Sequence, residues 1–311
     1  MGEIVAEVTE TEEVAPPPRR TPVTIARGLA RTARPKQWAK NVLVFAAPFA
    51  AGQITRLPVV GAAAIAFVAF CIAASAIYLI NDAKDVEADR AHPTKRNRPI
   101  AAGLVPVPAA IALSVVLLLG AIGVSFIDNW QLALVIGVYE VVQLGYCFGL
   151  KHERVIDLCI VASGFLLRAI AGGVAAHTPP SQWFLLVTAF GSLFMVSGKR
   201  YAEIRLFERT GAEIRASLRK YSASYLRFVW ATSVAIVITT YSLWAFDDLR
   251  AESHSAWAAI SIVPFVIALL RYAGDVDSGD GGAPDEIVLR DRILQLLGLC
   301  WALTVAFAFY L

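Results

Sequence analysis

The sequence predicts an all-α membrane protein in which nine transmembrane helices form a bundle with a polar cavity that faces the cytoplasm. Apolar residues make up 57% of the 311 residues, whereas charged residues make up only 17%. The mean hydropathy of +0.60 lies above the range of soluble domains. The charges are also segregated, because segments 104–127, 228–246 and 293–311 contain none. Since a helix needs roughly 20 apolar residues to cross a bilayer, such segments predict membrane spans.

The distribution of cations predicts the orientation. With the N-terminus in the cytoplasm, 25 of the 28 lysines and arginines fall in cytoplasmic segments. Arg56 and Arg250 fall on the other side, and Arg168 lies within a span. The positive-inside rule therefore predicts that the N-terminus and the candidate site face the cytoplasm, in a multi-pass protein that we expect in the inner (plasma) membrane. The nine expected spans are 41–55, 58–80, 105–127, 130–150, 156–177, 181–198, 225–246, 255–273 and 292–311.

The N-terminal segment differs in composition from the rest. Residues 1–30 are expected to form a disordered, acidic and proline-rich cytoplasmic tail, and residues 31–311 to form the transmembrane domain. No cleavable signal is expected, because the first fifteen residues contain five glutamates where a signal peptide would be basic. The four cysteines lie in apolar runs without a paired spacing, so we interpret them as packing residues rather than disulfides or metal ligands.

An acidic motif follows the second expected span. If that helix continues, Asn81, Asp82, Asp85 and Asp89 share one face. Like charges so close together repel one another unless a divalent cation lies between them, and hard oxygen ligands suit Mg²⁺, usually together with substrate phosphates. We therefore interpret this motif, at the membrane boundary, as a Mg²⁺–diphosphate site.

A solvated acidic helix end is the alternative interpretation of this motif. The residues that follow favour the site, because they place cations and turn-forming residues directly beside the carboxylates. These residues are Arg90, His92, Pro93, Lys95, Arg96, Arg98, Pro99 and Gly103.

Two other cytoplasmic segments carry candidate residues. The run from Arg34 to Asn41 can either anchor the first span at lipid headgroups or reach a phosphate, and both interpretations stay open. After the fourth span, Tyr146, Lys151 and Asp157 occupy a position equivalent to the acidic motif, since each segment joins an even span to an odd one. Asp157 can also be a favourable acid at a helix N-terminus.

The segment after the sixth span is the third candidate. Lys199 and Arg200 begin a stretch of about 25 residues in which charges alternate with apolar side chains. It can be an amphipathic helix on the membrane surface, or a lid that closes over a site and excludes water.

Two charges lie deeper in the membrane. Glu140 precedes Lys151 by eleven residues, and Arg168 follows Asp157 by eleven, so both lie roughly 16 Å from the cytoplasmic surface. An isolated charge at this depth is costly. We therefore predict that Glu140 and Arg168 pair across the fourth and fifth spans; a structural role and a place along a lipid channel both remain open.

The acidic motif resembles the first signature of the UbiA superfamily of intramembrane prenyltransferases. That signature is an Asn-Asp-x-x-Asp-x-x-x-Asp run followed by His-Pro, Lys, Arg-Pro and Gly, here residues 81–103. The nine-span layout also agrees, so the resemblance covers about residues 30 to 311. The second signature, an Asp-x-x-x-Asp pair, is replaced here by Tyr146, Lys151 and Asp157. With the runs at 34–41 and 199–203, this departure resembles the phosphoribosyltransferase branch of the superfamily.

The resemblance implies a Mg²⁺-dependent transfer of 5-phosphoribosyl from phosphoribosyl pyrophosphate to a polyprenyl (decaprenyl) phosphate, for synthesis of cell-wall arabinan precursors. The transmembrane domain would then be catalytic, with Mg²⁺ as its cofactor, the lipid bilayer as its environment and no nucleic-acid partner; the oligomeric state stays open. By this analogy Asn81, Asp85 and Asp89, with Asp82 in support, would hold Mg²⁺, and Asp157 would bind a second ion or the ribose. Substrate-binding residues would be Lys36, Lys40, Asn41, Tyr146, Lys151, Lys199 and Arg200.

Three alternatives were weighed against this function. A prenyltransferase that moves an isoprenyl group from its diphosphate to an aromatic acceptor would use the same Mg²⁺ chemistry, but the second Asp pair is absent. A transporter would place its charges near the bilayer midplane, whereas these acids cluster at one face. A non-catalytic membrane scaffold does not explain the ordered spacing of the carboxylates.

Overall fold

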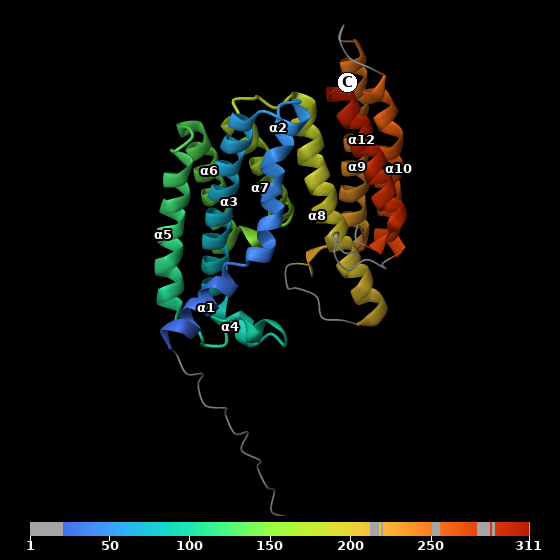
Figure 1. Cartoon of the computed structure of the whole chain (residues 1–311). Coiled ribbons are helices and arrows are strands. Elements are labelled where there is room, and N and C mark those ends of the chain that lie inside the picture. The colour runs from blue at the N-terminus through green and yellow to red at the C-terminus, as the bar shows by residue number, and fades with distance from the viewer. Residues whose placement is uncertain are drawn as a thin grey trace, which may run out of the picture.

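The computed structural model describes residues 21–211, 218, 220–250, 256–278, 287 and 290–310, and every regular element in these ranges is a helix. Figure 1 shows the long helices side by side, with α3, α5, α6 and α7 in one half and α8, α9, α10 and α12 in the other. The helices are α1 Pro22–Thr32, η1 Pro35–Phe45, α2 Ala46–Ala50, α3 Leu57–Lys84, α4 Val86–Arg90, η2 Lys95–Asn97, α5 Val107–Ser125, α6 Trp130–Phe148, η3 Leu150–His152, α7 Ile156–Ala175, α8 Gln182–Thr210, α9 Ala223–Arg250, α10 Trp257–Ser278 and α12 Arg292–Tyr310.

Six of these helices are long and apolar enough to cross a membrane, namely α3, α5, α6, α7, α9 and α10. The chain is therefore a multi-pass membrane protein. The other three expected spans correspond to the η1–α2 segment, to α8 and to α12, none of which is among those six. The count of nine spans stays a prediction.

Helix α1 occupies part of the segment that was expected to be disordered. Its N-terminus carries a capping box, in which the Thr21 hydroxyl accepts from the Thr24 backbone and the Thr24 hydroxyl accepts from the Thr21 backbone. Pro22 at the first helical position favours the same start. The expectation was therefore wrong for residues 22–30, while residues 1–20 lie outside the described residues.

The segment that was expected to form the first span begins earlier, at Pro35, and most of it is a 3₁₀ helix rather than an α-helix. Residues Pro35–Phe45 form a 3₁₀ helix of 11 residues, and Ala46–Ala50 continue it as five α-helical residues. At about 2.0 Å per residue the 3₁₀ part covers about 22 Å, and the α part adds about 8 Å. An α-helix of the same total length would cover only about 24 Å. The 3₁₀ winding therefore makes this segment about 6 Å longer than an α-helix with the same number of residues.

Close packing against α7 accompanies this winding. A Cβ atom built on Gly172 of α7 would overlap the Val44 backbone, at 2.6 Å from its carbonyl carbon and 3.0 Å from its Cα. Val44 is fully buried in a cluster that also contains Phe70 of α3 and Ile136 of α6. A second cluster joins α8, α9 and α10. This second cluster also contains Leu158 of α7, so the two halves pack against each other through α7.

Helix α8 extends past the expected membrane boundary. It continues to Thr210 and ends at Gly211, which has a positive φ of 67°. Residues 199–210, expected to begin a surface segment, therefore form the last turns of α8. The central part of that segment, residues 212–217 and 219, lies outside the described residues.

The predicted pairing of Glu140 with Arg168 is wrong. The two side chains form no ion pair within 4.0 Å, and Arg168 is bonded instead to Asn41, the Gly164 carbonyl and the Tyr139 hydroxyl. Tyr139 occupies the α6 position that faces Arg168. Glu140 is the next residue along the helix and points about 100° away.

Candidate functional site

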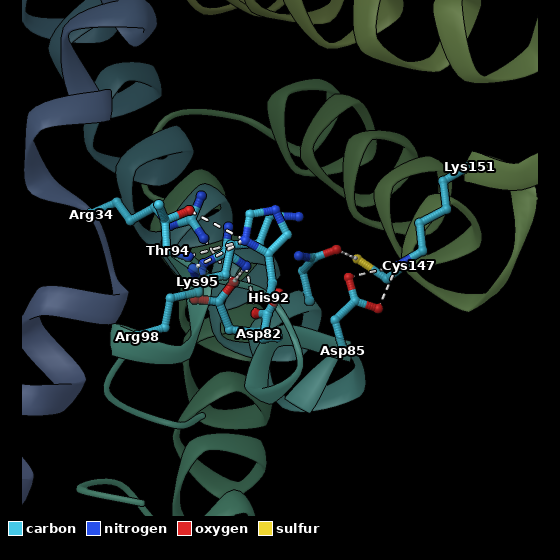
Figure 2. Close-up of polar contacts among 11 residues, drawn as sticks. Arg34, Asp82, Asp85, His92, Thr94, Lys95, Arg98, Cys147 and Lys151 are labelled. Atoms are coloured by element: carbon cyan, nitrogen blue, oxygen red, sulfur yellow. Dashed lines mark hydrogen bonds and ion pairs between the residues drawn. The ribbon is translucent and has the colours of Figure 1, made fainter. Parts of the chain in front are cut away.

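The acidic motif is divided between two directions at one end of the bundle. Helix α3 ends at Lys84, and Asp85 lies between α3 and α4 with φ −91° and ψ 10°, outside the α-helical region. This break means that the motif does not continue as one straight helical face, as had been expected. Figure 2 shows Asp82 on the side of Arg34 and Arg98, and Asp85 turned toward Lys151.

Asp82 and Asp89 are neutralised by two arginines. Asp82 Oδ1 accepts hydrogen bonds from Arg34 Nη2 at 2.7 Å and from Arg98 Nη1 at 3.0 Å. The same Arg98 nitrogen donates to Asp89 Oδ2 at 2.7 Å. The two carboxylate side chains are only 3% and 4% exposed. Two buried acids are thus balanced by two cations, and this group holds together α3, α4, the loop after η2 and the start of η1.

Asn81 and Asp85 face the opposite way, toward α6 and η3. Lys151 Nζ lies 2.5 and 2.7 Å from the two Asp85 carboxylate oxygens. Cys147 of α6 approaches Asn81 Oδ1 at 3.9 Å. The Asp85 side chain is 28% exposed, far more than Asp82 or Asp89, and Asn81 is half-buried. The more accessible oxygens of the motif therefore belong to Asn81 and Asp85. Figure 2 shows Lys151 beside Asp85.

Arg98 makes a testable contribution to this arrangement. Replacing it by methionine would leave Asp89 buried without an ion-pair partner among the described residues, which should destabilise the protein by up to about 3 kcal/mol. Adding Asp89→Asn should recover most of the loss, because the buried charge is then removed. Thermal unfolding of both variants in detergent measures the difference. A double variant that is no more stable than Arg98→Met would contradict this reading of the ion pair.

Asp157 lies in a separate buried cluster at the start of α7. Arg200 Nη1 of α8 donates to Asp157 Oδ2, and the Tyr221 hydroxyl donates to Asp157 Oδ1 at 2.5 Å. The same hydroxyl accepts from the backbone N–H of Val155 at 2.8 Å. Burial and then the bond to Asp157 raise the pKa of Tyr221 to about 12, so the hydroxyl stays protonated and donates near neutral pH.

This cluster contains a strained backbone position. Val155 has φ 67° and ψ −50°, and the Ile156 N–H bonds to the Arg154 carbonyl at 2.7 Å. That geometry is a γ-turn of the rare type, unusual for a β-branched residue. Sequence reasoning missed Tyr221 as the partner of Asp157, because 64 residues separate them and no local pattern links them.

The other predicted substrate-binding residues are dispersed over several elements. Lys36 is exposed on η1 and Lys199 is half-buried on α8, and neither has an ion-pair partner within the described parts of the chain. Lys40 is exposed on η1, and Tyr146 is half-buried in the last turn of α6. The expectation that Asn41 binds substrate differs from its surroundings in the structure. It is 1% exposed and bonded within the protein to Arg168 and Cys71, so its geometry does not support direct substrate contact.

The donor set can be tested for its fit to Mg²⁺. The described residues contain no cluster of three or more His, Cys, Asp or Glu side chains arranged to hold a metal ion. Asp89 in particular is turned to Arg98 and away from Asp85. Mg²⁺, however, is usually held by one or two protein oxygens together with substrate phosphates and waters. The accessible oxygens of Asn81 and Asp85 fit that requirement.

An apolar cavity lies between α2 and the helices α8, α9, α10 and α12. It has a volume of about 420 Å³ and is lined by residues of α2, α8, α9, α10 and α12. Its walls are largely aromatic, and include Phe49, Trp183, Tyr241, Phe265 and Trp301. Figure 1 shows α2 at the end of the bundle opposite to α1 and α4, so the cavity is remote from the acidic motif.

Comparison with known proteins identifies the family. The UbiA prenyltransferase family profile matches residues 42–299. A decaprenyl-phosphate phosphoribosyltransferase of Corynebacterium glutamicum is 58% identical over 94% of this chain and 90% of its own length. The protein of that name from Mycolicibacterium smegmatis is 53% identical over 98% and 99%. The solved structure of a UbiA homolog from Archaeoglobus fulgidus bound to DMAPP and Mg²⁺ matches with a TM-score of 0.68 at 19% identity, over 91% of this chain and 98% of that one. This chain belongs to the UbiA prenyltransferase family.

Proposed function

We propose that this protein transfers a 5-phosphoribosyl group from phosphoribosyl pyrophosphate to decaprenyl phosphate and releases pyrophosphate. The observation that carries the proposal is the 53–58% identity, over at least nine-tenths of both chains, to relatives named decaprenyl-phosphate phosphoribosyltransferase. An accessible carboxylate beside a lysine, at one end of a membrane bundle, supports the same chemistry. The product would serve as a precursor of cell-wall arabinan.

Asn81, Asp85 and Lys151 would bind the diphosphate end of the donor. Mg²⁺ held by Asn81 and Asp85 would neutralise charge on the diphosphate and stabilise it as a leaving group. Lys151, which bonds to Asp85 in the structure, would turn to a phosphate oxygen when substrate arrives. Asp82 and Asp89 would act indirectly, since Arg34 and Arg98 occupy their oxygens.

The buried cluster around Asp157 would orient the guanidinium of Arg200. Both Asp157 oxygens are bonded to Arg200 and Tyr221, so we propose that Asp157 positions Arg200 rather than contacting substrate. Lys36, Lys40 and Lys199 would supply charge for the 5-phosphate of the donor and the phosphate of the lipid, and Tyr146 would position the sugar. These cations lie on η1 and α8, on either side of the acidic motif in the chain.

The reaction needs no strong general base. The acceptor phosphate is already ionised, and its oxygen would attack C1 of the ribose while the bond from C1 to the diphosphate oxygen breaks. The bonding pair leaves with pyrophosphate, and the configuration at C1 is inverted. The main demand on the protein is to stabilise the diphosphate as C1 gains positive character, which fixed cations do well in a site that excludes water.

The isoprenoid tail requires an apolar path from this end of the bundle. We propose that the aromatic cavity between α2 and α8–α12 receives the distal part of a long tail.

Ala50→Trp should fill part of the cavity and raise KM for decaprenyl phosphate about tenfold, the effect of a few buried methylenes. KM for a short polyprenyl phosphate should not change. Val68→Trp, at an exposed position on α3 outside the cavity, is the matched control. Equal effects on both lipids would contradict this assignment.

The cation distribution supports a plasma-membrane protein whose N-terminus and acidic motif face the cytoplasm, where a sugar phosphate donor is available.

The decisive experiment incubates the purified protein with ¹⁴C-labelled phosphoribosyl pyrophosphate, decaprenyl phosphate and Mg²⁺. Label extracted into organic solvent, and lost with EDTA, is the expected result. Transfer of an isoprenyl group from its diphosphate to an aromatic acceptor, without phosphoribosyl transfer, would overturn the proposal.

A further inference from the structure

Arg168 is a buried cation within the membrane that has only neutral partners. It lies on α7, is 8% exposed, and forms no ion pair within 4.0 Å among the described residues. Its Nε donates to Asn41 Oδ1 at 2.7 Å and its Nη1 donates to the Gly164 carbonyl at 2.5 Å. The guanidinium also lies 5.0 Å from the ring of Phe70 and 5.2 Å from that of Tyr139. A charge at this depth is costly, so these contacts leave it one well-defined position.

Asn41 links this guanidinium to the 3₁₀ helix η1. Its oxygen accepts from Arg168, and its amide nitrogen lies 3.2 Å from the Cys71 sulfur on α3. Side chains three residues apart line up in a 3₁₀ helix, so Trp38 and Val44 lie in the same row as Asn41. Trp38 Nε1 bonds to Ser75 of α3 at 3.1 Å. The row therefore attaches η1 to its neighbours at successive turns.

The winding of η1 determines where its basic end lies. Lys36 is five residues from Asn41. If these residues relaxed to an α-helix, Lys36 would move about 2.5 Å along the axis and about 100° around it, because each residue would rise about 0.5 Å less and turn about 20° less. Arg34, which binds Asp82 at 2.7 Å, directly precedes the same segment.

We propose that Arg168 is a positioning residue: through Asn41 it holds Pro35–Phe45 in its extended 3₁₀ winding and so aligns Arg34, Lys36 and Lys40 with the acidic motif. The inference rests on the proposed function only where these cations are said to meet the donor phosphates. Its structural part, the control of η1 winding from the membrane interior, is independent of any substrate.

The kinetic test is a double-mutant cycle. Asn41→Ala and Arg168→Lys should each raise KM for phosphoribosyl pyrophosphate about tenfold, since a misplacement of about 1 Å can cost up to about 100-fold. KM for decaprenyl phosphate can rise as well, because Lys36 and Lys40 are also candidates for the lipid phosphate, so the donor KM is the deciding measurement. The double variant should show about the same tenfold effect, because both changes break one link. Asn41→Asp, which keeps an oxygen for Arg168, should restore the wild-type KM.

Tyr139→Phe is the matched control, because it removes a 3.4 Å contact to the same guanidinium without touching η1. It should leave both KM values unchanged. Thermal unfolding of each variant separates positioning from stability alone. A lower unfolding temperature with an unchanged KM for the donor in Asn41→Ala, or an equal KM change in Tyr139→Phe, would overturn the proposal.

A second readout needs no activity. Lys36→Cys is introduced with Cys159→Ala and Cys300→Ala, which remove the exposed native thiols, while the buried Cys71 and Cys147 remain. The rate of maleimide alkylation at position 36 should change severalfold when Arg168→Lys is added. A reporter at Glu87→Cys on α4 should not respond. If the wild-type protein transfers no phosphoribosyl group, the proposed function fails, but the alkylation experiment still tests whether Arg168 positions η1. An unchanged alkylation rate at position 36 would refute that positioning role.

Discussion

Asp85→Asn should lower kcat for phosphoribosyl transfer by about 100-fold or more, because it removes the accessible carboxylate of the acidic motif. Position 85 and Asn81 would then offer the diphosphate site only neutral amide oxygens. The Mg²⁺ concentration needed for half-maximal activity should rise at the same time. Initial rates at saturating substrates, measured across a Mg²⁺ titration, check both effects. The fold should persist, since Asp85 is partly exposed and its partner Lys151 can be solvated.

Glu87→Gln is the matched control for this prediction. Glu87 is two residues further along, its side chain is 80% exposed, and its ion-pair partner among the described residues is Arg90 on the same helix turn. Such surface pairs contribute about 0–1 kcal/mol, so activity and Mg²⁺ dependence should stay near wild-type values. If Glu87→Gln were as damaging as Asp85→Asn, the effect would reflect the general charge of the segment, and the assignment to Asp85 would fail.

Gly172→Ala should be the most destabilising single-methyl change considered for this chain. The added Cβ would overlap the Val44 backbone, and a backbone cannot avoid it by changing rotamer. Overpacking of this kind costs about 3 kcal/mol or more, which corresponds to a fall of about 10 °C in the unfolding temperature. Thermal unfolding and the yield of monodisperse protein in detergent measure the loss.

Gly123→Ala on α5 provides the comparison, because a Cβ there meets no atom within 4 Å among the described residues. It should be neutral or slightly stabilising, since alanine favours a helix over glycine. Equal stability of the two alanine variants would mean that η1 does not approach α7 as closely as the structure shows.

Features that depend on neighbouring residues in the sequence were easier to predict than contacts between residues far apart in the chain. The apolar runs that become α3, α5, α6, α7, α9 and α10 were predicted, because each is defined by its own length and composition. Helix α1 was not predicted, although Thr21, Pro22 and Thr24 form a recognisable helix start. The acidic composition of the residues before it had outweighed this local signal.

The sequence named candidate site residues but not their contacts. It singled out the acidic motif, Lys151 and Asp157, which all lie in or beside ion pairs in the structure, and their role in a site stays a prediction. It did not reveal that Arg98 binds two of the acids, or that Asp157 binds Arg200. Nor did it reveal that Arg168 prefers Asn41 to Glu140. These choices depend on helix rotation, which a difference of one residue changes by about 100°.

The linear sequence alone identified a membrane protein of the UbiA type with an acidic motif, because hydropathy and motif spacing are written along the chain; the orientation that its cations predict stays a prediction. Only the tertiary structure decided which carboxylate stays accessible, and that Pro35–Phe45 forms an extended 3₁₀ helix packed against α7. Both depend on contacts between residues far apart in the chain, such as Arg34 with Asp82 and Val44 with Gly172. Such contacts follow from how helices rotate and approach one another, and no local pattern records them.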